Sequence, residues 1–168
     1  MKTTKLTLGL LFVLILGFFG SCTNNRQNTG NYSDDLSPES KSAITNEIMD
    51  LTTNWANAHI SMDADKAIEL WDSTADLMFA ENGFFFANRD SIYSYLKGFY
   101  SSTKSMELQW QKRVVIPLSQ NAATMSGYFH FKAIFKDESS FEGNSMFTGV
   151  FVKKNNKWVL IHGHESFK

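Results

Sequence analysis

The spacing of apolar residues over positions 37–103 predicts three helices. Residues 37–39 (Ser-Pro-Glu) supply a hydroxyl cap, a proline in the first turn and an acid at the positive end of the helix dipole, so a first helix is expected over 38–60. Asp63 can cap a short second helix, and Asn88 can cap a third that ends near residue 103. The apolar stripes of the three helices consist of Ile44, Ile48, Leu51, Trp55 and Ala58; Ala64, Ala67, Ile68 and Trp71; and Ile92, Leu96, Phe99 and Tyr100.

Strands are predicted between the second and third helices and throughout the C-terminal half. Residues 77–80 and 84–87 flank Asn82 and Gly83, which is typical of a tight hairpin. From Met106 onward the apolar period changes to two, and short polar turns separate the runs, so neighbouring strands must be antiparallel. Helices placed ahead of such a sheet predict an α+β fold. The four long strands are expected at 106–118, 122–135, 141–153 and 158–166.

The first 21 residues have the pattern of a secretory signal. Two lysines precede an apolar run over 6–19, and two small residues follow directly before Cys22. As a helix this run would extend over only about 21 Å, so we expect a cleaved signal rather than the alternative of an uncleaved membrane anchor. The sequence Phe-Gly-Ser-Cys at 19–22 resembles the lipobox of bacterial lipoproteins, whose cysteine is lipidated and becomes the first residue of the mature chain.

Lipidation of Cys22 implies a bacterial envelope protein that is tethered to a membrane through its acyl chains. Residues 22–37 are polar and almost without aliphatic side chains, so they are expected to form a flexible linker to a domain over 38–168. Thr23 and Asn24 lack the acid that signals inner-membrane retention in the lipoprotein family. The resemblance therefore implies an outer-membrane location facing the periplasm.

The composition narrows the classes of function. The chain has 168 residues, of which 43% are hydrophobic, with 16 Lys and Arg against 17 Asp and Glu. This balance provides no basic surface, so we expect no nucleic-acid partner. The single cysteine excludes a disulfide scaffold, and the core must form by apolar packing. No dinucleotide fingerprint, phosphate loop or Ser-His-Asp elbow is present, and we expect no cofactor.

The order of elements resembles a known superfamily. Two helices ending in AIELW, a strand pair, a helix and a long meander ending in KWVLIHGHES are similar to the nuclear transport factor 2-like superfamily, and specifically to its SnoaL-like branch, over residues 37–167. The ending is also similar to the association domain of calcium/calmodulin-dependent kinase II. The resemblance implies a cone-shaped domain with a strongly bent antiparallel sheet. It does not imply one activity, because this scaffold carries isomerases, cyclases, dehydratases, hydrolases and binding modules.

A bent meander packed on helices has a concave side that three helices cannot fill, so we expect a cavity at its wide end. Phe129 belongs to the apolar face of the strand 122–135, and the family register implies that strands five and six contribute alternate residues to the same side. Plain core packing is the alternative role for the aromatic residues. The expected ligand-binding residues are Trp55, Trp71, Phe79, Tyr100, Phe129, Phe147, Gly149, Phe151, Ile161 and Gly163.

Glu165 is the leading candidate for a functional group because the register places it among these apolar residues. Desolvation raises the pKa of such a carboxyl group, which can then serve as a general acid, a base or an anchor for an amine. The alternative is a solvated or ion-paired Glu165 at the sheet edge. His59 follows Trp55 by four residues and is expected to face the cavity, where it could exchange a proton with Glu165. The alternative is a structural histidine at the end of the helix whose hydrogen bonds are already satisfied.

Ketosteroid isomerase relatives carry an aspartate base on the strand after the second helix. The best-matching position here is Ala80, and Glu81 is expected on the opposite face of that strand. This departure argues against isomerase chemistry of that kind. Asp72 and Asp76 are better explained as turn residues.

His162 and His164 alternate along the last strand, but a zinc site needs at least a third ligand, and we expect no metal. Together with Trp158, Tyr128 and His130, they are expected to cover the convex face of the sheet. Members of the superfamily commonly dimerise through this face, so a homodimer is expected.

Two functional hypotheses follow. The first is a lipid-anchored module that binds an unknown small apolar molecule in the aromatic cavity, oriented by Glu165. The second is a cofactor-independent enzyme of the SnoaL type that moves protons on a carbonyl compound, with Glu165 and His59 as the catalytic residues.

Overall fold

The computed structural model describes residues 36–74 and 77–168. The predicted signal sequence, Cys22 and nearly all of the predicted linker lie outside these residues. Within the described ranges, no helix is both long enough and apolar enough to cross a membrane.

The three predicted helix caps are confirmed. α1 (Pro38–Ile60) begins where the Ser37 hydroxyl oxygen accepts the backbone N–H of Ser40 at 3.2 Å. α2 (Ala64–Ala67) is capped by Asp63 and continues directly into a 3-10 turn, η1 (Ile68–Leu70). α3 (Arg89–Ser102) is capped by Asn88, whose side-chain oxygen accepts the N–H of Ser91 at 2.8 Å. Because α2 has only one turn, two substantial helices, not three, pack on the sheet.

Six strands form one curved sheet: β1 (Met78–Glu81), β2 (Phe84–Phe86), β3 (Thr103–Ser119), β4 (Ala122–Phe135), β5 (Ser140–Lys154) and β6 (Lys157–Phe167). Their order across the sheet is β2-β1-β6-β5-β4-β3. The antiparallel meander β3 to β6 and the hairpin β1–β2 are confirmed, but β1 also pairs in parallel with β6, so the sheet is mixed rather than antiparallel. β6 returns beside β1 only after α3 and three further strands, and this pairing has no signature in the local pattern.

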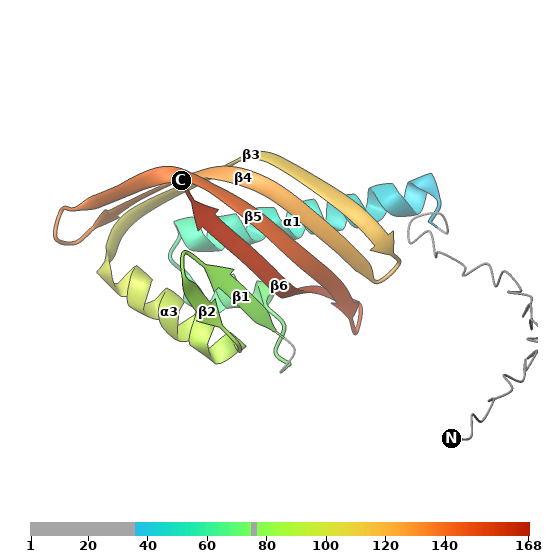
Figure 1. Cartoon of the computed structure of the whole chain (residues 1–168), viewed down its shortest axis with the longest axis horizontal. Coiled ribbons are helices and arrows are strands. Elements are labelled where there is room, and N and C mark those ends of the chain that lie inside the picture. Colours follow the sequence, from blue (N-terminus) through green and yellow to red (C-terminus); the bar gives the residue numbers. More distant parts are fainter. Residues whose placement is uncertain (1–35, 75–76) are drawn as a thin grey trace, which may run out of the picture. The chain divides into compact units, whose positions relative to one another are not determined.

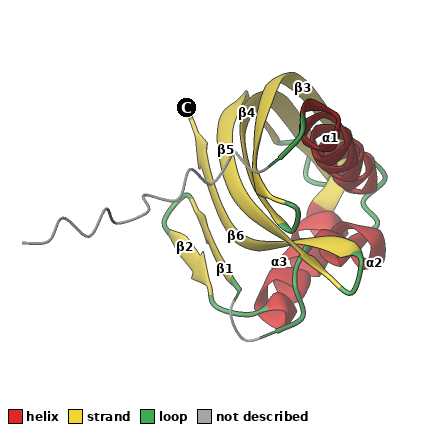
Figure 2. Ribbon diagram, turned by 90° about the vertical axis from the view of Figure 1, so that its right-hand side faces the viewer, coloured by secondary structure: helices red, strands yellow, loops and turns green. Residues whose placement is uncertain are grey.

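The long strands curve around the helices, which all lie on one side of the sheet (Figures 1 and 2). β-Bulges contribute to this curvature, because an extra residue on one strand bends it and increases its twist. One bulge lies between Trp110 and Lys112 on β3, opposite Phe129 and Tyr128 of β4, and Gly127 is the next residue along β4. A Cβ atom at Gly127 would lie 2.6 Å from the Lys112 carbonyl oxygen, so the bend requires glycine at this position.

A second bulge, on β6, corrects the predicted orientation of several residues. The register shifts between Val150 and Phe151, which leaves Ile161 as the extra residue on β6. As a result Leu160 pairs with Phe151 on the concave side and is fully buried, whereas Ile161 is only half-buried. The bulge likewise turns Trp158 toward α1, where its indole N–H donates to Glu47. Trp158 was expected on the convex face, and that expectation is wrong.

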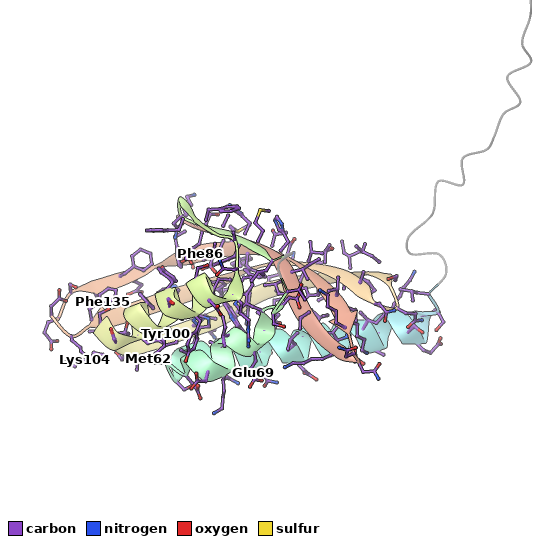
Figure 3. The ribbon with its side chains drawn as sticks, turned by 90° about the horizontal axis from the view of Figure 1, so that it is seen from below. Met62, Glu69, Phe86, Tyr100, Lys104 and Phe135 are labelled. Atoms are coloured by element: carbon purple, nitrogen blue, oxygen red, sulfur yellow. The ribbon has the colours of Figure 1, made fainter. Side chains whose placement is uncertain are left out.

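Hydrogen bonds fasten α1 to the sheet and to α3. The Arg113 guanidinium on β3 donates to the Met49 carbonyl oxygen at 2.7 Å and to the Thr52 hydroxyl at 2.8 Å. On the other side of α1, the hydroxyl of Tyr100 lies 2.8 Å from Nδ1 of His59. Seen from below, α3 carries Tyr100 alongside the C-terminal part of α1 (Figure 3). These contacts fix the positions of the two helices over the concave face of the sheet.

Candidate functional site

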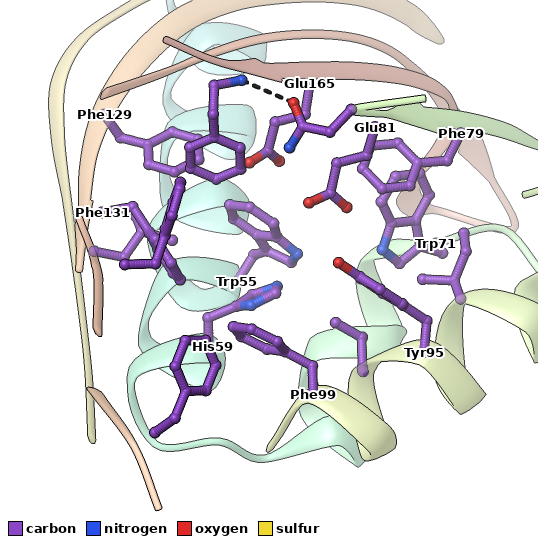
Figure 4. A pocket seen from close by; sticks show the side chains of 17 residues that line it. Trp55, His59, Trp71, Phe79, Glu81, Tyr95, Phe99, Phe129, Phe131 and Glu165 are labelled. Carbon is purple, nitrogen blue, oxygen red and sulfur yellow. Dashed lines mark hydrogen bonds between the residues drawn. The ribbon is translucent and has the colours of Figure 1, made fainter. Parts of the chain in front are cut away.

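An aromatic cavity of about 190 Å³ lies between α1, α3 and the concave face of the sheet. Figure 4 shows side chains from α1 and α3 and from strands β1, β4 and β6 pointing into it. Most of the lining residues carry aromatic rings, supplemented by Ile92, Leu96 and Leu108. The ionisable or amide side chains that reach it are His59, Glu81, Asn82 and Glu165, with the Tyr95 phenol. The predicted cavity is therefore present, and its chemistry depends on these few polar groups.

α1 positions Trp55 and His59 at the cavity because four residues make slightly more than one helical turn. Their rings meet edge to face with centroids 4.3 Å apart. Phe129 of β4 approaches Trp55 from the sheet at a centroid distance of 6.4 Å. Trp71 and Phe79 form a second aromatic pair, 4.6 Å apart. The tight contacts between these rings define a wall whose shape is largely preformed.

His59 is a neutral group in this wall. Burial among the surrounding rings lowers the pKa of His59 to about 3, so the imidazole carries no charge at physiological pH. Burial also raises the pKa of Tyr100, whose hydroxyl therefore keeps its proton beside Nδ1. Tyr100 contacts His59 from behind the cavity wall and is not itself part of the lining. A neutral His59 can donate or accept a hydrogen bond, but it cannot balance a negative charge.

Glu165 projects from β6 into the cavity and is only 6% exposed. The hydroxyl of Ser145 on β5 donates to Oε1 of Glu165 at 3.1 Å. Desolvation, followed by the nearby charge of Glu81, raises the pKa of Glu165 to about 8, although the Ser145 hydrogen bond opposes the shift. At neutral pH this carboxyl group is therefore predominantly protonated.

Glu81 is a second carboxyl group in the cavity, and its expected orientation was wrong. The parallel pairing of β1 with β6 sets Glu81 directly beside Glu165, and strands paired in this way lie about 4.8 Å apart. Phe79 and Glu81 face the cavity, so Ala80 between them faces away from it. Desolvation raises the pKa of Glu81 to about 7. Glu165 is thus one member of an acid pair, as Figure 4 shows.

Tyr95 of α3 faces this acid pair across the cavity (Figure 4). Burial, with smaller contributions from the charges of Glu81 and Glu165, raises the pKa of Tyr95 to about 12. The phenol therefore keeps its proton over the pH range in which the two carboxyl groups titrate. Its hydroxyl adds a neutral polar group to the end of the cavity that holds the acids.

Trp55 carries an unused hydrogen-bond donor. Among the buried side-chain polar atoms of the described residues, Nε1 of Trp55 is the one without a hydrogen-bond partner. The side chain is 6% exposed, and its ring edge faces the cavity (Figure 4). A buried donor without a partner costs about 1–3 kcal/mol, which a ligand acceptor could recover.

Sequence reasoning identified part of this lining. Trp55, His59, Trp71, Phe79, Phe129 and Glu165 all reach the cavity, as expected, whereas Tyr100, Phe147, Gly149, Phe151, Ile161 and Gly163 do not. The two glycines allow close packing instead: a Cβ at Gly163 would lie 3.0 Å from the Trp71 ring, and one at Gly149 would lie 2.6 Å from the Leu160 side chain. Glu81, Asn82 and Tyr95 were missed, although the two-residue spacing of Phe79 and Glu81 was an available signal for the first.

The convex face of the sheet carries the other histidines. His162 pairs with Val150 and His164 with Thr148, on the side opposite the buried residues of β5. No cluster of three or more His, Cys, Asp or Glu able to hold a metal ion occurs within residues 36–74 and 77–168. Several apolar side chains are exposed on this face: Val114, Ile116, Tyr128 and Met146.

Solved structures place the domain in the nuclear transport factor 2-like fold class. A nuclear transport factor 2-like superfamily protein from Salmonella enterica serovar Typhimurium is similar in structure, with a TM-score of 0.69 and 17% sequence identity over 75% of this chain and 92% of that one. A protein of Novosphingobium aromaticivorans, provisionally named a scytalone dehydratase, has a TM-score of 0.72 and 10% identity, covering 79% and 89%. A provisionally named calcium/calmodulin-dependent kinase II association domain from Xanthomonas campestris has a TM-score of 0.63 and 22% identity, covering 73% and 86%.

The sequence itself identifies the family. The SnoaL-like domain model matches residues 48–168, and the chain belongs to the SnoaL-like family. No curated protein matches the sequence.

Proposed function

We propose that this domain binds a small, largely apolar molecule in the aromatic cavity and orients it with the acid pair. The observation that carries the proposal is Glu165, a carboxyl group 6% exposed that faces an open cavity of about 190 Å³. Burying a carboxyl group opposes folding, so an apolar residue would serve packing better at this position. The buried acid is therefore better explained by a role in binding. The rings supply apolar contact, and the few polar groups supply orientation, as in most ligand sites.

The cavity volume limits the size of the ligand. An engineered protein cavity of about 150 Å³ accommodates benzene, so about 190 Å³ suits a molecule with one ring and a short substituent. A larger ligand would require side chains at the rim, such as Phe141, to move; Phe141 is 41% exposed and therefore has room to do so.

Native mass spectrometry of the purified full chain tests binding directly. We expect a small molecule to be retained by the wild type and lost from Leu108→Phe, which adds a ring to the cavity wall. Val114→Phe adds a ring at an exposed site on the same strand and serves as the matched control. Failure to retain any molecule, combined with no affinity for a panel of one-ring compounds, would contradict the proposed binding function.

A second candidate function is acid-base catalysis on a carbonyl compound without a cofactor. Two neighbouring carboxyl groups with pKa values of about 7 and about 8 supply an acid and a base near neutral pH. The neutral His59 and the free Trp55 N–H could hold the carbonyl oxygen. Turnover separates the two candidates: an enzyme of this type converts its substrate in the wild type and loses this turnover in Glu165→Gln while still binding the substrate, whereas a binding module shows no turnover in either protein.

We also propose that the domain is tethered to the bacterial envelope, in the outer membrane facing the periplasm, through lipid on Cys22. The support is the signal-like segment 1–21 and the lipobox-like residues 19–22. Cys22→Ala is expected to shift the protein from the membrane fraction to the soluble fraction, measured by fractionation and immunoblotting. Ser21→Thr changes the adjacent residue and keeps the cysteine as a control. An unchanged distribution of Cys22→Ala would refute lipid anchoring.

The convex sheet face supports a further proposal, that of a homodimer. Val114, Ile116 and Met146 are 47–60% exposed, and Tyr128 pairs with Met146 across neighbouring strands to form an apolar patch. Met146→Glu should raise the dimer dissociation constant at least about tenfold in sedimentation experiments, because it places a charge inside the patch. Asn57→Glu, an exposed change on α1, is the control. A monomeric wild type, or a Met146→Glu variant that still dimerises normally, would contradict this assignment.

A further inference from the structure

We propose that the ligand of this cavity is a small organic cation, a primary ammonium group on an apolar body that also bears a hydrogen-bond acceptor. The ammonium would lie against Glu81 and Glu165, and the acceptor would receive the N–H of Trp55. This inference rests on the proposed binding function and adds the charge and polarity of the ligand. It follows from three independent features of the same cavity.

The first feature is the lack of a counter-charge for the acid pair. Glu81 and Glu165 lie side by side on β1 and β6 and both face the cavity. None of the described residues lining the cavity is a lysine or arginine. Two neighbouring carboxylates in an apolar site repel each other and are poorly solvated, so they favour any bound cation. An anionic ligand would meet the same repulsion and is disfavoured.

The second feature is the aromatic surroundings of the acids. Trp71 and Tyr95 line the same part of the cavity as Glu81, and the Trp71 ring lies 4.6 Å from that of Phe79. The faces of such rings carry partial negative charge and attract an ammonium group. Aromatic rings next to carboxyl groups therefore favour a cation over a neutral hydrogen-bond donor of the same shape.

The third feature lies on the α1 side of the cavity. Nε1 of Trp55 is buried and has no hydrogen-bond partner among the described residues. Trp55 as a whole is only 6% exposed. A donor at this position needs an acceptor on the ligand. An ammonium group has donors but no acceptor, so it cannot receive this N–H, and another part of the ligand must do so. The complementary ligand therefore has an ammonium group and, apart from it, an oxygen or nitrogen acceptor.

The affinity of the acid pair for a cation should depend on pH, because cation binding is linked to loss of protons from the two carboxyl groups. The titratable groups that face the site are Glu165 on β6, Glu81 on β1, Tyr95 on α3 and His59 on α1. Tyr95 and His59 are neutral from pH 6 to 9, because their pKa values are about 12 and about 3. The carboxyl groups, with pKa values of about 7 and about 8, lose their protons in this range and so gain affinity for a cation. Cation affinity should therefore rise with pH, with release of protons.

Three probes of nearly equal shape test the charge: 4-methoxybenzylamine, 4-methoxybenzyl alcohol and 4-methoxybenzoate, titrated into the full chain by calorimetry. We expect the amine to bind at least about tenfold more tightly than the alcohol at pH 8.5, because hydrogen bonds to charged groups are the stronger ones. The benzoate should bind most weakly. Between pH 6 and pH 8.5 the affinity for the amine should rise, while that for the alcohol should not.

Variants separate the two ends of the site. Glu81→Gln combined with Glu165→Gln should remove most of the preference for the amine and leave the affinity for the alcohol within about threefold, because the shape is kept. Trp55→Phe should weaken the amine and the alcohol alike, by about three- to tenfold, since both carry the methoxy oxygen. Glu107→Gln removes an exposed carboxylate and is the matched control. If the double variant folds poorly, Glu81→Gln alone should still reduce the preference.

The outcomes distinguish this inference from the function on which it rests. Equal or tighter binding of the alcohol or benzoate, or a preference for the amine that survives both Gln substitutions, overturns the cation assignment and leaves the cavity a binding site. Absence of binding by all three probes also overturns it, and the mass-spectrometric experiment then decides separately whether the cavity holds any ligand.

Discussion

Glu165→Gln should stabilise the domain at alkaline pH by about 5 kcal/mol relative to the wild type. The pKa of Glu165 is raised from 4.5 to about 8 in the folded state, and each unit corresponds to about 1.4 kcal/mol. Because the folded pKa lies above the unfolded one, the folded state binds the proton more tightly. This contribution to stability is complete below about pH 4.5 and is lost as the pH rises through 8. Gln stays neutral throughout and can still accept the Ser145 hydroxyl.

Urea unfolding of the full chain at several pH values measures this effect. The free energy of unfolding of the wild type should fall between pH 5 and pH 9, and that of Glu165→Gln should fall much less. Glu81→Gln should show a weaker flattening, because the pKa of Glu81 is raised only to about 7. Glu107→Gln, at an exposed position, should follow the wild type. Parallel curves for the wild type and Glu165→Gln would show that the carboxyl group is solvated in solution.

Phe129→Ala should lower the free energy of unfolding by about 3–5 kcal/mol, the usual cost of removing a buried aromatic ring. Phe129 is 1% exposed and lies between helix and sheet, with ring centroids 6.4 Å from Trp55 and 5.0 Å from Trp110. Its loss removes these contacts and enlarges the cavity at the same time. Denaturant unfolding gives the magnitude, and calorimetric titration should show weaker binding of one-ring ligands because the enlarged site fits them poorly.

Phe85→Ala provides the matched comparison, since Phe85 is 65% exposed on the edge strand β2. A change of less than about 1 kcal/mol is expected there, as for most surface substitutions. If Phe129→Ala cost no more than Phe85→Ala, the region around the cavity would have to be loosely packed, and a preformed binding site would be untenable.

The aromatic and acidic residues of the cavity have opposite effects on the stability of the domain. The ring at Phe129 contributes to stability, whereas ionisation of the acid pair opposes it. The free energy of unfolding of natural domains is only about 5–15 kcal/mol, so ionisation of a buried acid that costs several kcal/mol removes a large part of it. A bound cation would offset this cost by pairing with the ionised carboxyl groups, so ligand binding should raise the stability of the domain.

The helix starts were predictable because they depend on residues close together in the chain. Ser37, Asp63 and Asn88 each accept a backbone N–H three residues ahead, and no distant contact is needed for this. The long strands were equally clear, since their alternation persists over many residues and short turns leave only antiparallel pairing.

The orientation of residues near irregular pairing was not predictable in the same way. The family register placed Ile161 on the concave side with Gly163 and Glu165, but the bulge at Ile161 puts Leu160 there and turns Trp158 toward α1. A bulge depends on how one strand meets its partner, and the sequence of β6 contains no separate signal for it. On β1, matching Ala80 to the base position of the isomerase relatives put Glu81 on the wrong face, whereas its two-residue spacing from Phe79 indicates that both residues face the cavity.

The sequence alone determined the class of fold and selected Glu165 as an acid among apolar residues, because both follow from local periodicity and a family pattern. Only the tertiary structure decided that Glu165 has Glu81 as its neighbour, since β1 and β6 are far apart in the chain and pair in parallel. It also decided which aromatic rings surround the two acids. The charge of the site therefore emerges from strand pairing, because electrostatic interaction depends on distance in space and not on separation along the chain.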